Sequence, residues 1–247
     1  MNFKEKCKVL WRIVWECFKR SLSSGFTYFC AATILMMLTM KGDITSGMTG
    51  TRWAWTIVCI VGAVAYNAFV IYFTGGNHYE MLVSGNMKRV SAMNMGSEYK
   101  ISSYKIEKEY RVWKGFVIGL FVAFFAIVGA IFFEVNATEI LKLGVKDAVL
   151  DRSVSIFVLL FFFTAGWALF PFVFANLAGA SVSYLFALFL AVIPLLVTGG
   201  MYIAGAYGRR GKSIRAQELA DRAAAAAQKP KKINYGGLPG TKPKKRK

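Results

Sequence analysis

The chain has 247 residues, is 56% hydrophobic and carries a formal net charge of +18. Charged residues are absent from several long stretches and concentrated in others. A bilayer imposes this distribution, because a charge at its centre costs roughly 2.5–3.5 kcal/mol. The pattern excludes an ordinary soluble domain and predicts an all-α, polytopic membrane helix bundle. Four cysteines without a CxxC pair and one histidine, His78, indicate neither a disulfide framework nor a metal or cofactor site.

Residues 1–21 are predicted to form a basic amphipathic helix that lies in the membrane interface. At 100° per residue, apolar side chains share one face and most of the charged side chains lie opposite. Tryptophan favours this location, because its ring is amphipathic. The aromatic side chains expected at a membrane interface are Trp11, Trp15, Phe18, Trp53 and Trp113. The single histidine, His78, is also expected there, just past an apolar run.

Five apolar segments within residues 22–208 are long enough to span a bilayer, which takes about 20 residues. They cover approximately 22–40, 53–75, 115–134, 154–178 and 183–207. The last two belong to one charge-free stretch, 154–208, which is too long for a single crossing at about 1.5 Å per residue. A tight turn near Asn176 and Gly179 is therefore expected to divide it.

Three polar regions complete the chain. The loop 77–114 holds seven Lys/Arg and four Glu, and its last part, 103–114, is predicted to be helical. The connection 134–153 is predicted to contain a short amphipathic helix through Ile140. The tail, 209–247, holds 13 Lys/Arg and two acidic residues, so its net charge is +11. It is expected to be helical over 213–228 and disordered beyond.

The basic residues give a conflict in topology. The N-terminal segment has six Lys/Arg, the loop 77–114 has seven, and the two other loops have two and three. The positive-inside rule places the first two in the cytoplasm, and five full crossings then place the basic tail outside. Two alternatives remain open. One half of 154–208 is re-entrant, which leaves 26 Lys/Arg inside and five outside, or the tail is translocated. We expect five membrane helices and leave the sidedness open.

Small and amide side chains are the candidates for contacts inside the membrane. Small residues at fourfold spacing let helix backbones approach closely, within the chain or between subunits. The predicted packing residues are Gly115, Gly119, Ala123, Gly200 and Ala204. Asn67 and Asn176 lie within apolar runs and are expected to make interhelical hydrogen bonds or to contact a solute. No paired carboxylates or histidine cluster indicate catalysis, so an enzyme is not expected.

Two functions remain as hypotheses. The first is an assembly or accessory subunit whose basic regions contact anionic lipid headgroups, a protein partner, a second copy or ribosomal RNA, with no specific DNA binding. The basic residues assigned to this contact are Arg209, Arg210, Lys231, Lys232, Lys244 and Lys245. The alternative is a small permease, or the membrane subunit of a transporter, for an uncharged solute. Compact loops and the lack of an organelle presequence favour a bacterial cytoplasmic membrane.

Overall fold

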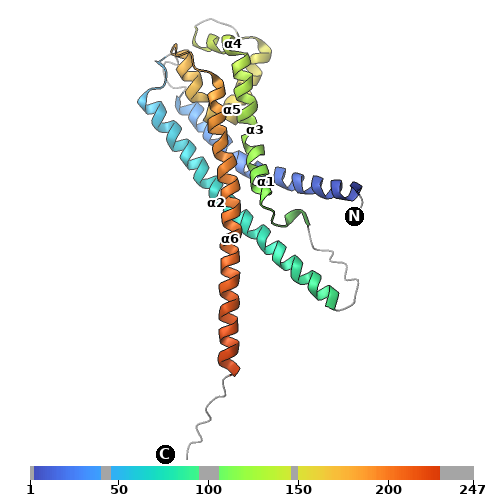
Figure 1. Cartoon of the computed structure of the whole chain (residues 1–247). Helices are drawn as coiled ribbons and strands as arrows, with labels where there is room; N and C mark the ends of the chain where they lie inside the picture. The colour runs from blue at the N-terminus through green and yellow to red at the C-terminus, as the bar shows by residue number, and fades with distance from the viewer. Residues whose placement is uncertain (1–2, 40–45, 95–105, 146–149, 229–247) are drawn as a thin grey trace, which may run out of the picture. The chain divides into compact units, whose positions relative to one another are not determined.

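A computed structural model describes residues 3–39, 46–94, 106–145 and 150–228, and these form helices and turns without strands (Figure 1). The predicted all-α fold is confirmed. The α-helices are α1 (Phe3–Thr39), α2 (Gly50–Asn94), α3 (Trp113–Val135), α4 (Ala137–Leu141), α5 (Arg152–Leu177) and α6 (Ala187–Gln228). Three short 3₁₀ turns are η2 (Ile106–Lys108), η3 (Lys142–Gly144) and η4 (Tyr184–Phe186).

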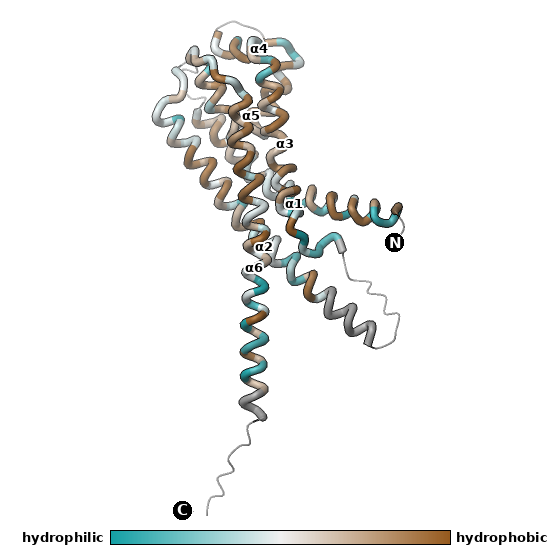
Figure 2. The backbone as a smooth tube through the Cα atoms, viewed as in Figure 1, coloured by the Kyte–Doolittle hydropathy of each residue, from teal (hydrophilic) through white to brown (hydrophobic). Residues whose placement is uncertain are grey.

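Five of these helices are long and apolar enough to cross a membrane, as predicted from the sequence. They are α1, α2, α3, α5 and α6, the last including η4. Figure 2 shows apolar residues along these helices and a change to polar residues in the part of α6 that follows Arg209. Residues 1–209 form one compact unit, and Arg210–Lys247 form a second. In its described part, the chain is therefore an all-helical protein with five helices able to span a membrane, and its last part is a separate unit.

Two helices extend beyond their predicted limits. The predicted boundary between segments 1–21 and 22–40 is not a break, because α1 is one continuous helix of 37 residues. Ser21 and Ser24 in this region are buried, and the Ser21 hydroxyl donates to the Phe18 carbonyl within the helix. The amphipathic segment and the first span thus share a single helix.

The second helix, α2, does not end at Gly75 as predicted but continues to Asn94. At about 1.5 Å per residue, its 45 residues are much longer than the roughly 30 Å hydrocarbon core. The predicted loop 77–114 is therefore helical in its first half. The predicted helix over 103–114 is wrong for its described part, where η2 is a single short turn and α3 begins at Trp113.

The charge-free stretch 154–208 divides into α5 and α6 at a tight turn, as predicted. Gly179 has a φ of +90°, a conformation that favours glycine because it lacks a Cβ. The short helix predicted through Ile140, Leu141 and Val145 is confirmed for the first two, which lie in α4 with Ile140 fully buried. Val145 follows η3 in an extended conformation and is not part of a helix.

The bundle of residues 1–209 has two ends, which we name after a buried polar residue at each. At the His78 end, one apolar cluster joins four helices: its buried members are Ile13, Cys17, Ile71, Ile118 and Tyr202. At the Arg52 end, the Arg52 guanidinium bonds to the last residue of α1, Thr39, and Glu134 near the end of α3 bonds to Tyr184. Helices α1, α2, α3 and α6 contribute to both ends and so run between them.

Helix α5 does not run between the two ends of the bundle, because both of its own ends contact the Arg52 end. Near its beginning, the Phe157 ring lies 5.5 Å from the ring of Phe132 at the end of α3. Near its other end, Phe174 lies under the Arg52 guanidinium. None of the residues of the His78-end cluster belongs to α5. Seven consecutive residues, 165–171, are buried, so this middle part of the helix is covered on all sides, as a core helix is. The first part of α5 is not, since Ile156, Phe157 and Leu159 are exposed.

Glycines bring α2 and α6 into backbone contact. A Cβ added at Gly75 would overlap the carbonyl oxygen of Tyr202, and a Cβ at Gly205 would overlap that of Tyr72. The two contacts are reciprocal and mark the point where the helices cross. Gly75 was expected to end a span, but its structural role is to let the two helices approach closely. In lipid, where the hydrophobic effect does not drive helices together, close packing of small residues favours their association.

The predicted small-residue stripe on α3 also packs on α6. Added Cβ atoms at Gly115 and Gly119 would clash with Tyr202 and Leu195, and Ala123 is buried in the core. The stripe predicted on α6 is displaced. Gly200 and Ala204 are exposed, and Gly200 has no neighbour within 4 Å of an added Cβ. Within the chain, their neighbours Gly199 and Gly205 make the contacts, because these point toward α3 and α2. Packing of Gly200 and Ala204 between subunits stays a prediction.

We predict that Gly75→Ala lowers the free energy of unfolding by about 1–3 kcal/mol, because the added methyl group overpacks a rigid backbone contact. Thermal unfolding of the purified protein in detergent measures the change. Gly62→Ala, on the same helix, is the matched control: an added Cβ at Gly62 meets nothing within 4 Å. Equal unfolding temperatures for the two variants would contradict a glycine-dependent crossing.

Candidate functional site

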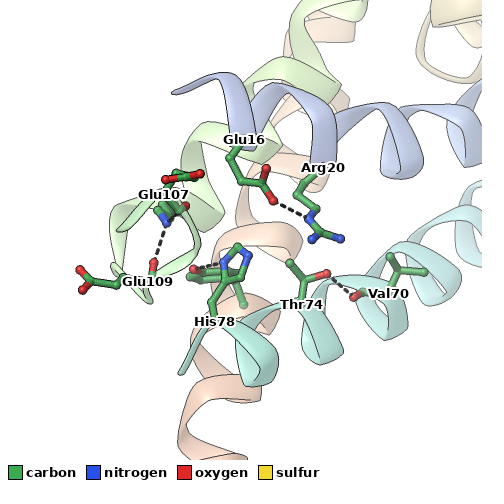
Figure 3. A network of polar contacts seen from close by, with 9 residues as sticks. Glu16, Arg20, Val70, Thr74, His78, Glu107 and Glu109 are labelled. Carbon is green, nitrogen blue, oxygen red and sulfur yellow. Dashed lines mark hydrogen bonds and ion pairs between the residues drawn. The ribbon is translucent and has the colours of Figure 1, made fainter. Parts of the chain in front are cut away.

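His78 is buried at the end of the bundle that bears its name. Its side chain is 3% exposed, and its Nδ1 lies 2.8 Å from the hydroxyl of Tyr202 on α6 (Figure 3). Its Nε2 makes no hydrogen bond within the described part of the chain. The expectation of a membrane-interface side chain is therefore wrong. His78 links α2 to α6 just below their glycine crossing.

The segment between η2 and α3 closes the bundle over this histidine. The Tyr110 amide donates to the carbonyl of His78 at 3.0 Å, and the Tyr110 ring stacks on that of Tyr202 with centroids 5.3 Å apart. Burial raises the pKa of Tyr110, so its hydroxyl stays neutral at physiological pH. We call residues 106–112 the η2 segment. Its contacts fix the end of the long α2–α3 connection to the His78 end.

Lys114 anchors the η2 segment from the first turn of α3. Its side chain is fully buried, and Nζ donates to the carbonyls of Glu107 at 2.6 Å and Glu109 at 2.5 Å. Sequence reasoning used Lys114 only as the boundary of a span and missed this role. No feature of the linear pattern separates a lysine that folds back onto carbonyl groups from one that extends into solvent.

Two ion pairs add to the His78 end. Arg20 pairs with Glu16 on α1 at 3.2 Å, and Arg209 on α6 pairs with Glu80 on α2 at 3.0 Å. Both pairs include partly exposed side chains, so each contributes at most about 1 kcal/mol. The Arg209–Glu80 pair shows where α6 leaves the first compact unit, because Arg209 is the last residue of that unit and lies at the His78 end.

Arg52 is the main polar residue at the opposite end. Its guanidinium is 6% exposed and donates to Thr39 O at 3.1 Å, Ser46 Oγ at 3.0 Å and Gly47 O at 2.5 Å. It also lies 4.6 Å from the ring centroid of Phe174, in a cation–π contact. One side chain thus joins the end of α1, the following loop, the start of α2 and the end of α5. Sequence reasoning counted Arg52 only as a loop charge.

Glu134 and Asn176 fix the α5–α6 turn at the same end. One carboxylate oxygen of Glu134, Oε2, accepts from the Ser183 hydroxyl at 3.0 Å and the Tyr184 amide at 2.7 Å. A carboxylate is favourable at a helix start, where amide groups lack partners. The Asn176 side chain donates to Val182 O and accepts from Val182 N, both at 2.7 Å. Asn176 therefore closes the turn itself.

Asn67 lies at the centre of the bundle and is fully buried. Its Nδ2 is 3.5 Å from the hydroxyl of Tyr28 on α1, and the Tyr28 ring packs on Trp167 of α5 with centroids 4.9 Å apart. The sequence predicted either an interhelical contact or a solute contact for Asn67, and this is an interhelical contact. Contact of Asn67 or Asn176 with a solute stays a prediction.

The predicted interface and basic residues are mostly exposed. Trp11, Trp15, Trp53 and Trp113 present their rings to the surroundings, whereas Phe18 packs partly on Phe121 of α3. Arg210 is exposed, and Arg209 makes the ion pair described above. The other assigned basic residues, Lys231, Lys232, Lys244 and Lys245, lie outside the described residues.

The described residues contain no group of three His, Cys, Asp or Glu side chains positioned to bind a metal ion. Comparison with protein-family models, with curated proteins and with solved structures gives no match for this chain. Function must therefore be inferred from the arrangement of the chain's own charged and polar residues at its two ends.

We predict that Arg52→Met destabilises the protein by about 2–3 kcal/mol, because hydrogen bonds to a charged group contribute roughly this much and their acceptors would lose a partner. Chemical unfolding in detergent micelles measures the effect. Arg152→Met, at the exposed start of α5, is the control and should change stability by less than about 0.5 kcal/mol. If Arg52→Met left the free energy of unfolding unchanged, the Arg52 contacts would not be what holds the Arg52 end together.

Proposed function

We propose that the chain is a membrane-embedded assembly or accessory protein that presents three basic segments on one membrane face to an anionic partner. The segments are the start of α1, the long α2–α3 connection and the tail that follows Arg209. The observation that carries the proposal is that described residues adjoining all three segments lie at the His78 end. Cys17 on α1, Tyr110 in the η2 segment and Arg209 on α6 all contact residues there.

The course of α5 supports this arrangement. Four helices run between the two ends of the bundle, and α5 begins and returns at the Arg52 end. An even number of end-to-end passes therefore separates Phe3 from Arg209, and the tail leaves the bundle on the side of the N-terminus. This corresponds to the re-entrant alternative for 154–208. Backbone that turns back within the membrane is tolerated where protein covers it, and residues 165–171 in the middle of α5 are buried.

The charge distribution agrees with this topology. With the His78 end facing the cytoplasm, 26 Lys/Arg lie inside and five lie outside. The positive-inside rule is then satisfied in every basic region, which five full crossings cannot achieve. The bacterial cytoplasmic membrane is the proposed location, because its inner surface is where such basic segments face anionic headgroups.

Anionic phospholipid headgroups are the proposed first partner. Arg210, Lys212 and Arg215 are exposed on α6 beyond the first compact unit. Basic residues near a negatively charged membrane contribute about 1 kcal/mol each. Trp11 and Trp15 are exposed on the N-terminal part of α1 and fit the interface beside those headgroups. A protein complex, a second copy of the chain or ribosomal RNA could bind the same basic side chains as a further partner.

We predict that neutralising Arg210, Lys212 and Arg215 to Gln weakens binding to anionic vesicles by about 3 kcal/mol, roughly a hundredfold. The protein is placed in phosphatidylcholine nanodiscs, and its cosedimentation with vesicles containing phosphatidylglycerol is measured against ionic strength. Binding of the unchanged chain should fall as salt rises, because exposed charges are screened within about 8–10 Å.

The control replaces Lys142 and Arg152 with Gln at the Arg52 end. These two changes should leave vesicle binding unaltered, since the proposal places them on the other membrane face. If the tail variant bound vesicles as well as the unchanged chain, lipid headgroups would be rejected as the partner of the tail.

A further inference from the structure

A polar cavity of about 520 Å³ lies at the Arg52 end, between α4 and the α5–α6 turn. This volume is within the usual range for small-molecule sites, roughly 300–1,000 Å³. Its lining residues come from two stretches that are distant in sequence: one contains Glu134, Ala137 and Leu141, and the other contains Asn176 and residues 179–184. The basic segments of the proposed function take no part in it.

Among the described residues of the lining, Glu134 provides the charge. Its Oε2 is occupied by the Ser183 hydroxyl and the Tyr184 amide, as described above. Its Oε1 accepts no hydrogen bond from the described residues. The side chain is half-buried, so this oxygen has lost part of its hydration. A carboxylate in such a position is stabilised by a cation that donates hydrogen bonds to it.

Tyr184 belongs to the lining of the cavity, but its hydroxyl group is buried. The residue is 2% exposed, and its hydroxyl makes no hydrogen bond of ordinary geometry in the described part of the chain. It lies close to the Asn176 side chain, whose two polar atoms are engaged with Val182. Buried hydroxyl groups nearly always have a partner. The Tyr184 hydroxyl oxygen is fully enclosed, so among the described residues the carboxylate oxygen Oε1 of Glu134 is the group without a hydrogen-bond partner that this cavity offers to a ligand.

We propose that this cavity binds a small organic cation through a primary or secondary ammonium group. The ammonium donates to Glu134 Oε1, and the exposed residue Ser181 belongs to the same lining. Ala137 and Leu141 provide an apolar wall for the carbon part of the ligand. A calcium ion fits less well, because it takes six to eight oxygen ligands and usually several carboxylates. The lining has one.

The nearest basic side chain on the same element does not neutralise the site. Lys142 is in the short turn η3, and its Nζ donates to both carboxylate oxygens of Glu139, at 2.7 and 2.8 Å. Neither residue lines the cavity. This internal pair leaves Glu134 as the charge available to a ligand. It also makes Glu139 a suitable control, since it is a glutamate on the adjacent helix with a partner of its own.

The ammonium group has two possible sources: a free amine or the headgroup of an aminophospholipid. The test uses purified full-length protein in dodecyl maltoside, which contains no ammonium group. One arm adds n-butylammonium, with n-butanol as its neutral counterpart. The other adds mixed micelles of phosphatidylethanolamine, with phosphatidylglycerol as the counterpart. The unfolding temperature is measured over a range of ligand concentrations, since a ligand that binds the folded state raises it.

We expect n-butylammonium to stabilise the unchanged chain and Glu139→Gln, whereas Glu134→Gln weakens its binding by at least about tenfold. Glutamine keeps an acceptor for Ser183 and Tyr184, so the turn is retained and only the charge is lost. Ala180→Trp, which fills the cavity without altering Glu134, should also abolish the response. A response to phosphatidylethanolamine with the same dependence on Glu134 identifies the headgroup as the source.

Three results would overturn the proposal. One is equal stabilisation by n-butylammonium and n-butanol, which would show that the cavity binds the carbon chain and not the ammonium group. Another is an equal response in Glu134→Gln and Glu139→Gln. The third is no stabilisation of the unchanged chain by either ammonium compound. The vesicle assay with the tail variant is independent of all three, so failure here and failure of the proposed function are distinguishable.

Discussion

The arrangement of the bundle depends on two charged side chains that hold the α5–α6 turn at the end where α1 stops. Arg52 bonds to the end of α1 and lies over Phe174 near the end of α5, and Glu134 accepts from the first residues of η4. Both charges are removed from water to a large extent, which is stabilising only because their hydrogen bonds replace the lost hydration. Since α5 also begins near Phe132, its return to this end makes it a core helix that does not pass through to the other end.

The direction of α6 follows from that constraint. Starting beside Glu134, it can only run toward the His78 end, where glycines let it cross α2 at backbone distance. His78, Tyr202 and the η2 segment lie at this crossing and tie the long connection to it. Cys17, Tyr110 and Arg209, which adjoin the three basic regions, are thereby brought to one end of the bundle, although they are far apart in sequence. The opposite end has a different character, with the Glu134 carboxylate in a cavity whose described lining includes no basic side chain. The proposed functions of the two ends differ for this electrostatic reason.

The sequence predicted the helical membrane fold, the five apolar segments and the turn near Gly179, because these depend on local hydropathy and on glycine. It did not predict the lengths of α1 and α2. Ser24 and Gly75 resemble helix ends in a linear pattern, and only their contacts with other helices show why the helix continues. Likewise, Lys114 and Arg52 appeared to be surface charges at span boundaries. Their acceptors are carbonyl groups that become neighbours only in the fold, so no local signal identifies them. Gly200 was placed one residue away from the packing face for the same reason.

The central claim is that the N-terminus and the tail lie on one side of the membrane and the α4 region on the other. It is tested most directly by labelling single cysteines in intact cells with a membrane-impermeant maleimide. Native Cys7 is exposed near the N-terminus, and Ser213→Cys and Thr138→Cys supply exposed positions in α6 and α4, with the remaining cysteines replaced by alanine. We predict that Cys7 and the cysteine at 213 are both protected until the cells are permeabilised, whereas the cysteine at 138 is labelled from outside. Labelling of the cysteine at 213 from outside, with Cys7 protected, would contradict the same-side arrangement and require α5 to cross the membrane.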